Sequence, residues 1–168
     1  MSELLALADR LYALPLDAFT PARDAHVKEH KGQPLAAELK RLRKPSLAAW
    51  VVNLLVRVET EQVEQILEVG AALRQAQAAM SAQELRELTR QRRQLTEAVT
   101  TRARAIARER GVKVTEAVAT QVQDTLTAAM LDEGAARAVR SGLLVAPLAA
   151  TGVDAVDVAP AVAAPEAL

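Results

Sequence analysis

Two histidines one helical turn apart are the residues whose types and spacing could perform chemistry in this chain. His26, Glu29 and His30 match H-x-x-E-H, the inverted zinc-hydrolase motif in which both histidines bind zinc and the glutamate activates water. A catalytic zinc needs a third protein ligand, and the chain has only two histidines and no cysteine. No carboxylate in the sequence is marked as that ligand. We therefore predict a solvated polar face without an integral metal, with adventitious metal binding as the alternative.

A basic run before a short turn suggests a second kind of chemistry, the reading of DNA by a helix-turn-helix. Residues 40–44 are Lys-Arg-Leu-Arg-Lys, and Pro45 and Ser46 separate them from the apolar helix LAAWVVNLLV. A recognition helix must present polar side chains to base edges, and this one offers only Asn53. We instead expect Trp50 and Asn53 to be core or near-core residues whose N–H and amide groups find backbone partners.

The third pattern is an arginine stripe on a long helix expected over residues 82–110. Plotted at about 100° per residue, five arginines fall within an arc of about 60°. These candidate nucleic-acid-binding residues are Arg86, Arg90, Arg93, Arg104 and Arg108. Arg92 and Arg110 fall instead beside the apolar face, where we expect their stems to pack. Along the helix axis the stripe extends for roughly 33 Å, enough for several phosphates of one nucleic-acid backbone.

Three interpretations of this stripe remain open. It is a solvated or intramolecularly neutralised face, a polyanion site, or a contact for an acidic or helical protein partner, self-association included. Residues 82–113 carry nine basic and four acidic residues, and residues 114–168 carry two basic and seven acidic ones. No aromatic residues interleave with the arginines, so any binding of nucleic acid is expected to depend on phosphates and to tolerate different sequences.

The elements that must position these residues are all α-helical. Apolar spacing, caps and Pro or Gly breaks predict about eight helices, over residues 3–13, 18–31, 35–43, 47–57, 61–80, 82–110, 116–131 and 134–141. The fifth and sixth form a long hairpin across the capping box Ser81 to Glu84. Residues 1–150 should form one helical bundle. Residues 151–168, rich in Ala, Pro and Val, are expected to be a disordered tail.

Composition narrows the function classes further. The chain has 168 residues, no cysteine and only three aromatic residues, which predicts a reducing, cytoplasmic location and an aliphatic core. Acidic residues interrupt the first apolar run, so we expect no signal peptide, and the longest apolar run is too short to span a bilayer. No motif marks a nucleophile with its base or a glycine-rich phosphate loop. We predict no catalytic residues, no cofactor and no membrane partner.

Several segments resemble an uncharacterised all-helical protein family of high-GC actinobacteria. The resemblance rests on LYALPLDAFTPARDAH and LKRLRKPSLAAWVVNLLVR between residues 11 and 57, and on DTLTAAML and ARAVRSGLL near the end. It covers about residues 3–153 and supports the expected helix boundaries. It implies no activity, cofactor or active site. The sequence therefore favours a non-enzymatic helical binding protein whose partner is a nucleic-acid backbone or, alternatively, another helical protein or a second copy.

Overall fold

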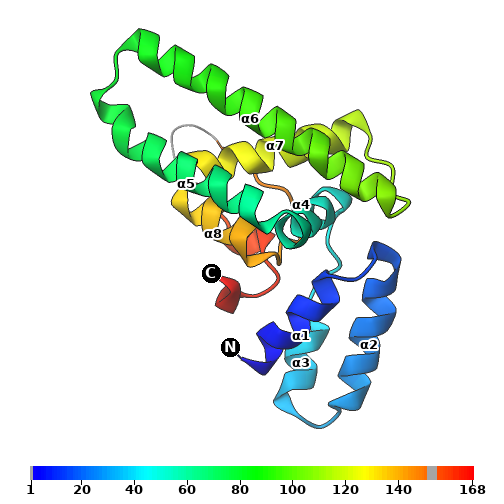
Figure 1. Cartoon of the computed structure of the whole chain (residues 1–168). Helices are drawn as coiled ribbons and strands as arrows, with labels where there is room; N and C mark the ends of the chain where they lie inside the picture. The colour runs from blue at the N-terminus through cyan, green and yellow to red at the C-terminus, as the bar shows by residue number, and fades with distance from the viewer. Residues whose placement is uncertain (1, 151–154) are drawn as a thin grey trace.

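The computed structural model describes residues 2–150 and 155–168, and in these ranges it is an all-α helical bundle (Figure 1). Eight α-helices are present in the described ranges. They are α1 (Glu3–Tyr12), α2 (Phe19–Glu29), α3 (Pro34–Lys40), α4 (Leu47–Val58), α5 (Thr60–Ala76), α6 (Ala82–Glu109), α7 (Glu116–Leu131) and α8 (Glu133–Ser141). The predicted fold class and number of helices are confirmed.

Side-chain caps explain where most of these helices begin. Ser46 accepts a hydrogen bond from the Ala49 amide at 3.1 Å and starts α4. Ser81 and Glu84 form the predicted capping box at the start of α6. α5 begins at Thr60 without a side-chain cap, and the Thr60 hydroxyl donates to the Val56 carbonyl at 2.8 Å because α5 follows α4 almost directly.

Two hydrophobic cores organise the chain. The larger is built around α4, whose seven buried residues contact α5, α6, α7 and α8. The smaller lies among α1, α2 and α3 and includes Leu143, Val145 and Ala164 from the C-terminal segment. The three N-terminal helices accordingly form a separate lobe below the α4–α8 bundle in Figure 1. Segments 143–145 and 161–164 contribute to both cores.

α5 and α6 are joined by a short connection, as predicted, and an ion pair of 2.8 Å between Glu59 and Arg102 links them at the start of α5. Both pack against α7 (Figure 1). α5 approaches α7 most closely at Gly70, where an added Cβ would lie 2.7 Å from the Cα of Met130. Just beyond, Arg74 donates a hydrogen bond to the Met130 carbonyl at 2.8 Å and so caps the end of α7. Gly70 therefore sets the separation of α5 and α7.

The C-terminal segment corrects the expectation of a disordered tail over residues 151–168. Residues 151–154 lie outside the described residues, but residues 155–168 pack on the bundle. The Val145 amide donates to the Ala161 carbonyl at 2.7 Å, and the Ala163 amide donates to the Leu143 carbonyl at 2.9 Å. Val162 is 2% exposed. Backbone pairing with residues 143–145 offsets the conformational entropy that is lost when this segment becomes ordered, which its small side chains alone would not offset. Composition does not reveal this long-range contact.

Asp132 holds the C-terminal segment against the bundle at a second position. Its carboxylate caps α8 by accepting from the Ala135 amide at 2.9 Å, and it also accepts from the Val156 amide at 3.1 Å. Burial opposes ionisation of Asp132, but these backbone hydrogen bonds and the nearby Arg74 outweigh it and hold the pKa of the carboxyl below its usual value. The charged carboxylate therefore holds the C-terminal segment against the start of α8.

Replacing Gly70 with alanine tests the close approach of α5 and α7. In an exposed helix, Gly→Ala stabilises by about 1 kcal/mol. Here the added methyl group would overlap the Met130 backbone, so we expect Gly70→Ala to lower the free energy of unfolding by about 1–3 kcal/mol. Urea titration followed by circular dichroism measures this difference. A stabilised Gly70→Ala variant would contradict the observed packing.

Removing residues 155–168 tests the C-terminal segment. Loss of the buried Val162 side chain and two backbone hydrogen bonds should lower the free energy of unfolding by about 3–5 kcal/mol, which corresponds to a fall in melting temperature of at least about 6 °C. The point variant Val162→Asp should also destabilise, whereas Glu166→Gln at an exposed position should not. An unchanged melting temperature after truncation would show that the segment contributes no packing energy.

Candidate nucleic-acid interface

The arginine stripe lies on the face of α6 that the bundle leaves uncovered. α6 packs against α4 and α7, and its buried residues are Leu88, Thr96, Val99, Thr100, Ala103, Ile106 and Ala107. Four of the five predicted stripe residues are exposed: Arg86, Arg90, Arg93 and Arg108. In the described ranges Arg86, Arg93 and Arg108 form no ion pair, since the ion-paired arginines of α6 there are Arg90, Arg102 and Arg104.

Arg104, the fifth predicted residue, is turned toward its own chain. Its Nη2 donates to the Val114 carbonyl at 2.8 Å, and its Nη1 lies 3.0 Å from Oε1 of Glu116. Its side chain is only 30% exposed. Arg104 thus stabilises the connection between α6 and α7, and its place on the helical wheel did not reveal this because Val114 and Glu116 are reached only after the chain reverses.

Arg90 is exposed but paired within its own helix. Its Nη2 donates to both carboxylate oxygens of Glu87, at 2.6 and 2.8 Å. That hydrogen bond is the main cause of the lowered pKa of the Glu87 carboxyl. Exposed pairs at this spacing contribute little to stability and are screened by salt. A phosphate can therefore replace Glu87 as the partner of Arg90.

Arg92 lies beside the apolar face of α6, as its position on the helical wheel predicted. Its Nη1 atom is buried and has no hydrogen-bond partner among the described residues. Burial lowers the pKa of its guanidinium group. Arg92 is therefore oriented away from the exposed stripe.

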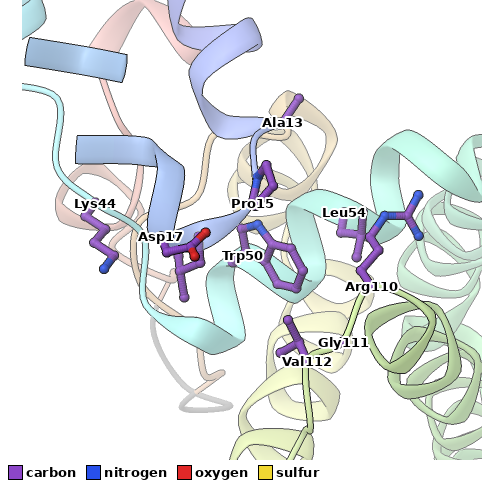
Figure 2. Close-up of a pocket in the computed structure, with 10 residues that line it drawn as sticks. Ala13, Pro15, Asp17, Lys44, Trp50, Leu54, Arg110, Gly111 and Val112 are labelled. Carbon is purple, nitrogen blue, oxygen red and sulfur yellow. The ribbon is translucent and has the colours of Figure 1, made fainter. Parts of the chain in front are cut away.

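A cleft lies where the end of α6 meets the turn after α1. It has a volume of about 410 Å³ and is lined by the Trp50 ring, with Lys44 and Arg110 on either side (Figure 2). Trp50 is 4% exposed, and its indole N–H donates to the Leu14 carbonyl at 2.9 Å. The predicted core position of Trp50 is confirmed. The cleft itself was missed, because its walls come from segments far apart in the sequence.

The predicted role of Asn53 is also confirmed. Asn53 is fully buried, and its amide group hydrogen-bonds to the Leu144 backbone. The polar side chain with which α4 could have read DNA bases is therefore turned into the core. The basic segment before α4 remains exposed at Lys40, Arg41, Arg43 and Lys44.

His26 lies in the last turn of α2, and His30 is the residue that follows the helix at the C-cap. His26, Glu29 and His30 each place one donor atom within 4.8 Å of the others. Glu3 of α1 adds a carboxylate oxygen 3.8 Å from Nε2 of His30. Sequence patterns do not point to Glu3, because only the packing of α1 against α2 brings it there.

The described helices include none that is long and apolar enough to cross a membrane. No family model, curated protein or solved structure matches this chain. The resemblance to an actinobacterial helical family therefore stays a prediction.

Because Trp50 is the single tryptophan, intrinsic fluorescence reports directly on the cleft. A 4% exposed indole should emit at shorter wavelength than free tryptophan and be quenched poorly by iodide. Unfolding in urea should shift the emission to the red and restore quenching. Red-shifted, readily quenched emission from the native protein would show that the ring is open to solvent.

Proposed function

We propose that this chain is a non-enzymatic protein that binds an extended polyanion, with a nucleic-acid backbone as the favoured partner. The observation that carries the proposal is the exposed row Arg86, Arg90, Arg93 and Arg108 on one face of a 28-residue helix. We refer to these four residues as the exposed arginine row. Its length of roughly 33 Å is close to one turn of duplex DNA.

The chemistry of the row favours phosphates over bases. Guanidinium groups bind phosphate oxygens through two parallel hydrogen bonds. The row contains no aromatic side chain on which a base could stack, and α4 has no exposed polar face for the major groove. Binding should therefore be strongly salt-dependent and largely independent of sequence.

The alternative function is a helical interaction or self-assembling scaffold protein. That function needs an apolar helix face left free for a partner. From Leu95 onward the apolar side of α6 is instead packed in the core with α4 and α7 of the same chain, and the exposed large hydrophobic residues in the described ranges are the scattered Val58, Val69 and Leu168. This burial supports the polyanion proposal over the scaffold.

A salt titration of duplex binding tests the proposal. Each phosphate contact should contribute about −0.9 to the slope of log affinity against log salt, so four contacts give a slope near −3.6. The triple variant Arg86→Gln, Arg93→Gln, Arg108→Gln should reduce the magnitude of the slope by about 2.7 and weaken all sequences alike. Fluorescence anisotropy with unrelated duplexes at several salt concentrations measures both quantities.

A second triple variant separates the row from overall charge. Arg10, Arg41 and Arg137 are exposed and lie on other elements. Their replacement by Gln removes the same charge, and we expect it to leave the slope nearly unchanged. Equal losses in both triple variants would mean that overall charge, not the row, attracts the polyanion. Absence of binding at about 50 mM salt, a condition that favours phosphate contacts, would refute the proposal, and light scattering would then test the scaffold alternative.

A further inference from the structure

We propose that His26, His30, Glu29 and Glu3 form an exchangeable site for a divalent transition-metal ion that joins α1 to α2. This site is separate from the exposed arginine row. The donor atoms of His26, Glu29 and His30 lie within 4.8 Å of one another. In a tetrahedral zinc site with bonds of about 2.0–2.1 Å, the donors lie about 3.4 Å apart. Small rotations of the side-chain ends would close this difference.

The hydrogen bonding of His30 prepares its ring for a metal. Its Nδ1 lies 2.8 Å from the His26 carbonyl oxygen. A carbonyl only accepts hydrogen bonds, so in the neutral ring Nδ1 carries the proton and Nε2 keeps its lone pair. Metal-binding histidines are typically oriented by this kind of backbone contact. Nε2 is also the atom that faces Glu3, 3.8 Å from its Oε1.

His26 supplies the second imidazole of the site. Its Nδ1 is buried without a hydrogen-bond partner in the described part of the chain. It lies 3.5 Å from Oε2 of Glu29, in a geometry that forms no hydrogen bond. A buried polar atom without a partner costs free energy. A metal ion held between this nitrogen and the Glu29 carboxylate would remove that cost.

The two carboxylates complete the donor set and can move to do so. The side chains of Glu29 and Glu3 are 69% and 71% exposed. Two imidazoles with one or two carboxylates suit Zn²⁺ and related ions, whereas Mg²⁺ prefers all-oxygen ligands. Because Glu3 belongs to α1 and the other three residues lie in α2 or at its C-cap, a bound ion would link the two helices.

The surroundings of the site indicate ion binding and not hydrolysis. The cleft in Figure 2 lies at the start of α2, whereas the histidines lie at its C-terminal end, roughly 15 Å along the axis. The α1–α3 lobe has a buried core to which the C-terminal segment also contributes, so we expect it to fold without the ion. The metal would therefore add stability to a lobe that is already folded.

Isothermal titration of tag-free, chelator-treated protein with ZnCl₂ tests the site. We expect one Zn²⁺ per chain, no comparable binding of Mg²⁺, and a weakening of at least about tenfold in His26→Gln and in His30→Gln. At free Zn²⁺ about 100-fold above Kd, the melting temperature should rise by about 5–10 °C. Glu3→Gln should weaken binding by about threefold or more, and the matched control Glu109→Gln on α6 should not.

The chain has only two histidines, so imidazole ¹H–¹⁵N NMR of the unmodified protein reports on the site without any variant. Zn²⁺ should shift the signals of both rings at the same stoichiometry. No saturable binding up to about 100 µM Zn²⁺ would overturn the proposal, as would binding that leaves either ring unshifted. Wild-type affinity in Glu3→Gln would overturn the link between α1 and α2.

Discussion

The fold depends on one buried amide, the side chain of Asn53 in the centre of α4. It donates to the Leu144 carbonyl at 2.9 Å and accepts from the Leu144 amide at 3.0 Å, in a site closed to solvent. An unpaired backbone group there would cost about 1–3 kcal/mol, so these two bonds fix the path of residues 143–145 across α4. Ser46 then donates its amide to the Val145 carbonyl at 2.9 Å. The segment that joins the two cores is thus fastened to the most buried helix.

One turn further along α4, Arg57 extends this constraint to the N-terminal lobe. Its guanidinium donates to the Gly142 carbonyl at 2.8 Å and to the Asp9 carboxylate at 2.7 Å. Gly142 ends α8 at φ 68°, a left-handed conformation that glycine adopts without strain. These contacts dock α1 beside the bundle. As a result, the turn that follows α1 lies against the end of α6. The cleft beside Trp50 results from this docking.

The sequence predicted what depends on local patterns. The capping box at Ser81 and the apolar spacing of each helix give the helices to within a few residues, and the uniform apolarity of α4 identifies the central helix. Contacts between distant residues could not be predicted in this way. The pairing of residues 143–145 with 161–163, the approach of Gly70 to Met130, and the meeting of Glu3 with His30 each depend on how helices dock. For the candidate interface, periodicity placed five arginines on one face, but only the tertiary fold shows that Arg104 bonds to Val114.

Arginine has two roles in this chain, and the distinction bears on its function. Arg23, Arg57, Arg74 and Arg104 each donate to a backbone carbonyl of another segment, at Leu42, Gly142, Met130 and Val114. These long guanidinium groups satisfy carbonyls at helix ends and turns. Arginine content alone is therefore no argument for a polyanion partner. The argument comes from Arg86, Arg93 and Arg108, which lie on the outer face of a long helix. None of the described carbonyls outside α6 accepts a hydrogen bond from them. Their charge is therefore left available for a partner.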